Sequence, residues 1–139
     1  MATDLLPSGS SGLQVDIVTP TKEVFSGFAA EVRVPGWEGE FGVLPGHDIV
    51  MSLLRCGVCT IVASGTEKKF VIGRGFVEAG PDRVTVLTEK CVPAQEIDRG
   101  KANADLVAAE NDFAKADYES AEWRNAEERM EFALASCSL

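Results

Sequence analysis

Hydrophobic and polar residues alternate along the chain from Leu13 to about Val92, and this period of two predicts short β-strands. In the first of them Leu13, Val15 and Ile17 alternate with polar residues, which is typical of a strand with one buried face. Turns too short for helical crossovers separate the segments, so we expect mainly antiparallel pairing. About eight to ten strands at this spacing predict a β-sandwich or flattened barrel. The expected strands cover residues 13–17, 24–28, 30–34, 49–54, 58–63, 69–72, 76–79 and 84–87.

The pattern changes at Pro93, and from Lys101 to Leu139 the sequence contains no glycine or proline. Alanine, glutamate and lysine dominate there, and these residues favour helix. Asp98 is a candidate N-cap, because its carboxylate suits the free amides of a first helical turn. Apolar residues recur at helical spacing: Ala102, Leu106, Ala109, Phe113, Ala116, Trp123, Met130, Leu134 and Cys137.

A polar gap at residues 115–120 favours a break between two antiparallel helices. If this stripe of apolar residues is continued through the gap at a period of about 3.5, the only polar residues that fall on it are Ser120 and Glu127. The alternative is therefore one helix from Asp98 to Ala135, about 57 Å long at ~1.5 Å per residue. Because alanine buries little apolar area, the stripe predicts helices that hold loosely and can detach. A permanently docked hairpin is equally compatible with the pattern.

The chain of 139 residues is thus predicted to be an α+β protein. Residues 1–12 have linker-like composition and form a flexible leader, residues 13–92 form the antiparallel β-sandwich, and residues 93–139 form the two-helix hairpin. The net charge is −9 and no basic cluster is present, which excludes a typical nucleic-acid or anionic-lipid surface. No apolar run approaches the ~20 residues of a membrane span.

Candidate catalytic groups are sparse. The single histidine, His47, has no neighbouring nucleophile, and the sequence has neither a nucleophile elbow nor a phosphate-binding loop, so no enzyme, cofactor or metal site is expected. Cys56 and Cys59 form a CxxC pair that no second pair completes. We interpret the cysteines as buried reduced thiols, with a redox pair or metal site as the weaker alternative. The first residues lack the pattern of a secretory signal, and a reducing, cytoplasm-like compartment is expected.

Turn residues concentrate in the segment from Glu38 to His47, which has the sequence EGEFGVLPGH. Three glycines and a proline constrain its backbone, while its side chains offer one aromatic ring and two carboxylates. We expect a surface loop that contacts a partner and performs no chemistry.

Five stretches of sequence carry a resemblance to a known family. They are IVTP at 17–20, VFSG at 24–27, GEFGVLPGH at 39–47, GRGFVE at 73–78 and VTVL at 84–87. With the alanine-rich helical pair, they closely resemble the ε subunits of F-type ATP synthase, whose mitochondrial counterparts are called δ. The similarity runs from about Leu13 to Leu139; GEFGVLPGH is its most specific part, and the helical half alone would be a weak match.

This resemblance implies a non-catalytic subunit of the central rotor stalk. In the family the sandwich packs against the γ subunit, sits on the c-subunit ring, and helps couple proton flow to ATP synthesis. The helices either fold on the sandwich or extend along γ into the α/β catalytic head, where they inhibit ATP hydrolysis. The implied location is peripheral, on the cytoplasmic face of the bacterial inner membrane or on the matrix side of the mitochondrial inner membrane.

The resemblance also implies interface residues. Glu40 would face the polar loops of the c ring, and His47 would lie on the side that meets γ. A solvated carboxylate, a structural turn histidine and, for Phe41, a core anchor are the alternatives. Gly42 and Gly46 are expected to serve the backbone path. The expected c-ring and γ interface comprises Glu38, Gly39, Glu40, Phe41, Gly42 and His47.

A nucleotide-sensing motif of the family, I/L-D-x-x-R-A, corresponds here to Ile97, Asp98, Lys101 and Ala102. Lys101 replaces the arginine and lacks its planar fork, and a later basic position of the family falls on Ala108. At most weak ATP binding is expected, and Asp98 alternatively serves only as an N-cap.

The helical half carries eleven carboxylates and five basic residues from Glu96 onward, a net charge of −6. Like charges disfavour docking on acidic segments of the catalytic head, so the rotor role is better supported than inhibition. Without the resemblance, three classes remain, of which an enzyme is the least supported. A ligand-binding sandwich would have an apolar pocket, whereas an interaction subunit would expose an apolar patch on one face of the sandwich.

Overall fold

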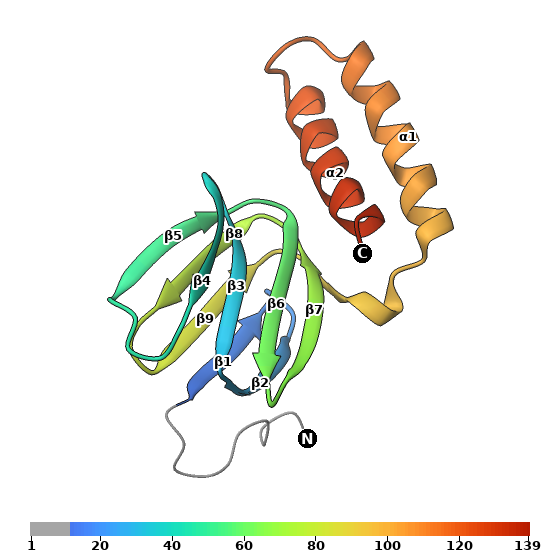
Figure 1. The fold of residues 1–139 in the computed structure, drawn as a ribbon. Coiled ribbons are helices and arrows are strands. Elements are labelled where there is room, and N and C mark those ends of the chain that lie inside the picture. Colours follow the sequence, from blue (N-terminus) through green and yellow to red (C-terminus); the bar gives the residue numbers. More distant parts are fainter. Residues whose placement is uncertain (1–11) are drawn as a thin grey trace.

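The computed structural model describes residues 12–139, so the predicted leader lies, apart from Gly12, outside the described residues. The described chain forms ten strands, a short 3-10 helix and two α-helices (Figure 1). The elements are β1 (Leu13–Val18), β2 (Glu23–Ala29), β3 (Glu31–Gly36), β4 (Gly39–Val43), β5 (Val50–Leu54), β6 (Gly57–Ala63), β7 (Thr66–Ile72), β8 (Gly75–Ala79), β9 (Arg83–Thr88), β10 (Cys91–Pro93), η1 (Ala94–Glu96), α1 (Arg99–Lys115) and α2 (Ala121–Cys137).

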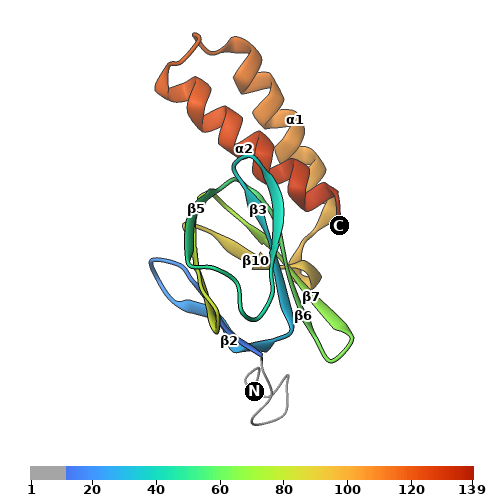
Figure 2. The same ribbon diagram turned by 60° about the vertical axis from the view of Figure 1, so that its left-hand side comes forward.

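The strands form one continuous hydrogen-bonded sheet in the order β10-β7-β6-β3-β5-β8-β9-β1-β2, with β4 beside β3. The sheet folds over on itself into a sandwich that approaches a barrel (Figures 1 and 2). Its pairs are antiparallel except β1 and β9, which run parallel with Gln14 beside Arg83 and Val18 beside Leu87. The prediction of a mainly antiparallel sandwich or flattened barrel followed by two helices is confirmed.

The core lies between the folded halves of this sheet. Leu13, Val15 and Ile17 are fully buried, as their alternation with polar residues predicts. Val32 and Val34 of β3 face the same core. Burial of each such side chain contributes about 1.5–3 kcal/mol to the stability of the sandwich.

The two helices begin at residues that cap them. Asp98 Oδ1 accepts a hydrogen bond from the Lys101 amide at 3.1 Å, and Ser120 Oγ accepts one from the Trp123 amide at 3.2 Å. The break falls in the polar gap, so the helices form a hairpin in this structure and not one rod. α2 packs on β6 and β7, and α1 packs along the other side of α2 (Figure 1). No helix among residues 12–139 is long and apolar enough to cross a membrane.

Small and aromatic residues close the helix hairpin from within. Ala109 of α1 and Ala126 of α2 have no exposed surface. Near the turn, the rings of Phe113 and Trp123 lie 5.0 Å apart, and Tyr118 meets Trp123 edge-on at 5.1 Å. The alanines thus let the two helices approach closely, and the aromatic rings hold the far end of the hairpin together.

Two strands were not expected from the sequence. β4 lies inside the segment predicted to be a loop, and β10 is a strand of three residues that ends at Pro93. β4 contains two glycines and only a short alternation of Phe41 and Val43, so its intrinsic β propensity is low. Pairing with β3 makes it a strand. Only residues 44–49 of this region form a loop.

Candidate functional site

The β3–β4 hairpin presents most of the predicted interface residues. Its two-residue turn is Trp37-Glu38, and Gly39 closes it at φ +142°, where a glycine is favoured. Glu38, Gly39, Glu40 and Gly42 are all exposed, whereas Phe41 is half-buried and packs on the core as an anchor would. The hairpin therefore offers carboxylates and bare backbone to a partner.

His47 lies apart from this turn, in the loop beyond the other end of β4. Its amide donates a hydrogen bond to the Leu44 carbonyl at 3.1 Å, and its Nδ1 lies 2.6 Å from the Asp48 carbonyl oxygen. The neighbouring Gly46 has φ +86° and donates its amide to the Pro81 carbonyl at 2.7 Å. The structure thus does not bring His47 together with Glu38 and Glu40.

An apolar row crosses the outer face of four strands. Leu53 of β5 pairs with Phe76 of β8, Phe76 with Leu87 of β9, and Leu87 with Val18 of β1. We call Leu53, Phe76, Leu87 and Val18 the apolar row; they line a shallow groove of ≈ 560 Å³. Met51 of β5 and Ile49, in the loop just before β5, extend the row, and Ile49 is 86% exposed. The sequence alone did not set the strand register that reveals this surface.

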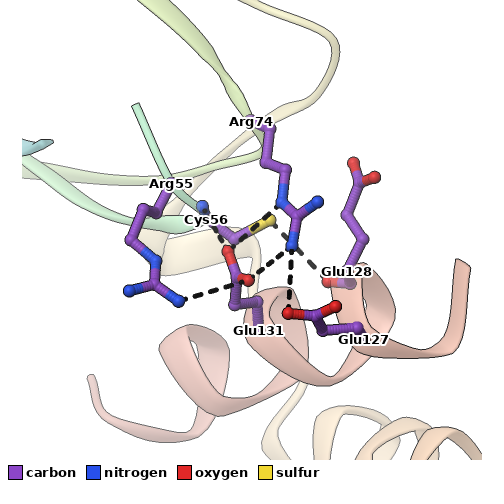
Figure 3. Close-up of polar contacts among 6 residues, drawn as sticks. All are labelled: Arg55, Cys56, Arg74, Glu127, Glu128 and Glu131. Carbon is purple, nitrogen blue, oxygen red and sulfur yellow. Dashed lines mark hydrogen bonds and ion pairs between the residues drawn. The ribbon is translucent and has the colours of Figure 1, made fainter. Parts of the chain in front are cut away.

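Polar contacts hold α2 against the sandwich (Figure 3). Arg74 Nη2 lies 2.6 Å from Glu131 Oε2, Arg55 Nη2 lies 3.6 Å from the same oxygen, and the Cys56 amide donates to Glu131 Oε1 at 3.1 Å. Glu127 adds a longer pair with Arg74 at 3.9 Å. One glutamate of α2 thus gathers donors from two separate segments of the sandwich.

Burial raises the pKa of the Glu131 carboxyl, but the hydrogen bonds from Arg74 and Cys56 and the charges of Arg74 and Arg55 outweigh it. The pKa consequently lies below its usual value, and Glu131 is charged at neutral pH. The hydrogen bond with Glu131 raises the pKa of Arg74.

The sequence analysis did not identify Glu131, Arg74, Arg55 or Cys56 as residues that hold α2 on the sandwich. Glu127 was the available signal, because a polar residue in an apolar stripe suggests a charged partner on the facing surface.

The nucleotide-motif residues Ile97, Asp98, Lys101 and Ala102 line one cleft of ≈ 770 Å³ between the helices and the sandwich, together with Ala108. Its three basic side chains already have partners. Lys101 Nζ lies 3.1 Å from Asp105, Arg129 Nη2 lies 2.6 Å from Asp112, and Lys90 Nζ lies 4.0 Å from the centre of the Phe132 ring. Five carboxylates also line the cleft: Glu89, Glu96, Asp98, Asp105 and Glu128.

All four cysteines are free thiols. Burial, with the charges of Glu131 and Glu128, raises the pKa of Cys56 to about 12, and burial raises the pKa of Cys59 to about 12. At neutral pH both are therefore poor nucleophiles. Within residues 12–139 no group of three or more His, Cys, Asp or Glu side chains is placed to hold a metal ion.

Solved structures share this fold. A chain of the Euglena gracilis mitochondrial ATP synthase, from a cryo-EM structure of the OSCP/F1/c-ring, superposes with a TM-score of 0.79 and 23% identity, covering 94% of this chain and 83% of its own. A chain from the central stalk/c-ring of the Tetrahymena thermophila mitochondrial ATP synthase superposes with a TM-score of 0.60 and 16% identity, covering 90% and 96%. At sequence identities of 23% and 16%, these similarities show a shared fold alone.

Sequence comparison extends further. The model of the ATP synthase delta/epsilon chain β-sandwich domain matches residues 12–94. The ATP synthase epsilon chain of Maricaulis maris is 38% identical over 104 residues, covering 75% of this chain and 78% of its own. That of Geobacter sulfurreducens is 38% identical over 122 residues, covering 88% of each. The chain therefore belongs to the ATP synthase delta/epsilon family.

Proposed function

We propose that this chain is a non-catalytic central-stalk subunit that docks on the γ subunit through the apolar row and couples c-ring rotation to ATP synthesis. The observation that carries the proposal is the exposure of large apolar side chains on β5 and β8: Met51 is 66% exposed, Leu53 63% and Phe76 36%. A contiguous apolar surface of this kind marks a protein interface, because a lone monomer would leave it in water. Because the chain belongs to the ATP synthase delta/epsilon family, we propose that the partner is a subunit of the ATP synthase.

The β3–β4 turn is the part of the surface that we propose to meet the c ring, through Glu38, Gly39 and Glu40. Two observations support this role. The turn is exposed and short, and pairing with β3 fixes the position of its backbone. The apolar row begins beside this turn, at Leu53, whose carbonyl accepts the Trp37 amide, whereas His47 lies beyond the other end of β4. We propose that the apolar row and His47 face γ. The complex would place the chain peripherally, on the cytoplasmic face of a bacterial inner membrane or the matrix side of a mitochondrial one.

Changing Met51 to lysine is expected to weaken binding to γ by about tenfold or more, because burying a methionine side chain contributes about 1.5–3 kcal/mol. Lysine is chosen because Met51 pairs with Glu78 across β8, so the variant gains an opposite charge and keeps its fold. The measurement is co-elution of the full chain with a γ subunit on a sizing column, followed by titration.

Val107→Lys supplies the matched control, since Val107 is equally apolar and 57% exposed but lies on α1. Equal binding of γ by both variants would exclude the apolar row as the docking face. If the unmodified chain binds no γ subunit, the proposed function fails and a ligand-binding sandwich becomes the better reading.

For the helices we propose a regulatory role in which nucleotide contributes little. The three basic side chains of the cleft between the helices and the sandwich are engaged and five carboxylates also line it, so a triphosphate would meet net negative charge. Calorimetric titration with Mg-ATP is expected to give a Kd weaker than about 1 mM. The Lys101→Arg variant, which restores the planar fork, is expected to bind more tightly. Micromolar binding by the unmodified chain would contradict the proposal.

A further inference from the structure

We propose that the turn of the β3–β4 hairpin and the docking of α2 are energetically coupled, because the same two arginines serve both. Trp37 occupies the turn, Arg55 follows β5, Arg74 lies between β7 and β8, and Glu131 lies on α2. These four residues come from four separate segments of the chain. The coupling is internal to the chain and does not depend on the binding of γ or the c ring.

On the side of α2, the contacts converge on one carboxylate. The Glu131 side chain is only 15% exposed and lies 2.6 Å from Arg74 and 3.6 Å from Arg55. Arg74 presents two nitrogens to it, since its Nε also lies 3.5 Å from Oε1. A largely desolvated carboxylate depends strongly on such partners, so the orientation of the two guanidinium groups decides how firmly α2 is held.

On the side of the turn, both guanidinium groups lie against the same indole. The Cζ atoms of Arg55 and Arg74 are each 5.3 Å from the centre of the Trp37 ring. Backbone hydrogen bonds fix the turn beside them: the Trp37 amide donates to Leu53 at 3.0 Å, and the Arg55 amide donates to Pro35 at 2.9 Å. The indole therefore restrains both arginines in the positions from which they reach Glu131.

Two consequences follow by linkage. Withdrawal of the indole frees the two arginines and weakens their hold on Glu131, so α2 opens more often. Conversely, release of α2 leaves Trp37 and both arginines free to engage other groups, and the coupling is the same in both directions. Trp37 is 44% exposed, so a binding partner can reach it while α2 is docked.

The chain carries its own reporter of α2 docking. Cys56 is buried under α2, and its Sγ donates to the Glu128 carbonyl at 3.7 Å. Only 9% of Cys56 is exposed, at the edge of the cleft between the helices and the sandwich, so opening of α2 is expected to accelerate its alkylation above a slow rate in the docked state. Cys59 is fully buried in the sandwich core and reports opening of the sandwich itself. Iodoacetamide labelling, quantified for each cysteine by peptide mass spectrometry, separates the two events in one sample.

A double-mutant cycle with Trp37→Leu and Glu131→Gln tests the coupling. Leucine keeps apolar bulk at the turn but removes the aromatic face. In the unmodified background, Trp37→Leu is expected to accelerate labelling of Cys56 about five- to thirtyfold, with labelling of Cys59 unchanged. In the Glu131→Gln background the same change is expected to have less than about a twofold effect, and comparison within each background cancels the direct influence of Glu131 on the thiol.

Phe28→Leu, a change of an exposed aromatic residue on β2, is the matched control and should leave both rates unchanged. Equal acceleration in the two backgrounds, or none in either, would overturn the proposal. If Trp37→Leu also accelerates Cys59, the milder Trp37→Phe replaces it, because a phenyl ring keeps more of the bulk but attracts the guanidinium groups less than an indole does. Selective acceleration of Cys56 by Trp37→Phe that vanishes with Glu131→Gln supports the coupling, and its absence refutes it.

Discussion

Replacing Gly75 with alanine is expected to lower the free energy of unfolding by about 3 kcal/mol. A Cβ at this position would lie 1.9 Å from the Leu87 carbonyl oxygen and 2.8 Å from the Thr88 Cα. Both neighbours are backbone atoms of β9, which pairs with β8 at this point, so no side chain can move aside. The two strands must separate locally. Urea denaturation followed by circular dichroism measures the loss.

Gly80→Ala is the matched control for this experiment. Its Cβ would meet only the Ile49 Cγ1, at 3.8 Å, which is an ordinary contact. We expect a change within about 0.5 kcal/mol, since the loss of chain entropy in the unfolded state favours alanine slightly. Equal stability of the two variants would show that β8 and β9 do not approach at Gly75 as the structure has them.

Replacing Ala109 with phenylalanine is expected to open the helix hairpin while the sandwich stays folded. Ala109 has no exposed surface, and α1 packs along α2, so the larger ring has no space unless the helices separate. Overpacking of this kind costs about 2–3 kcal/mol. Amide hydrogen exchange in α1 should therefore accelerate about 30- to 150-fold, while β-strand amides keep their protection.

Ala104→Phe gives the comparison, because Ala104 is exposed on the same helix and accepts a ring without contact with α2. It should leave exchange in α1 unchanged. If Ala109→Phe behaves like Ala104→Phe, the close approach of the two helices at Ala109 does not hold. If the β-strand amides lose protection as well, the hairpin and the sandwich unfold as one unit and the helices are not a detachable element.

Local patterns predicted most of the fold. The alternation at Leu13, Val15 and Ile17 identified a core strand, and Asp98 identified the start of α1, because these signals depend only on neighbours in sequence. β4 was missed for the opposite reason. Its glycines carry little propensity, and it becomes a strand only through pairing with β3.

The candidate surfaces were less accessible from the sequence. The apolar row depends on the register of four strands, and a shift of one residue would turn each of its side chains inward. The contacts of Glu131 join residues that lie far apart in sequence, and their local signal was limited to Glu127, a polar residue in the apolar stripe of the helices. The predicted interface residues lie at the two ends of β4, with Glu38 at one end and His47 beyond the other. The prediction of a single loop could not show this separation.

The parallel pairing of β1 with β9 affects the order in which the sandwich can assemble. β1 pairs on one edge with β2, which follows it directly in sequence, but the partner of its other edge is the distant segment Arg83–Thr88. During synthesis this edge remains unpaired until almost the whole sheet has left the ribosome. Joining segments so distant is slow, because the loop entropy is lost before the contacts form. We therefore expect the sandwich to close late, once the segment Arg83–Thr88 has paired with β1.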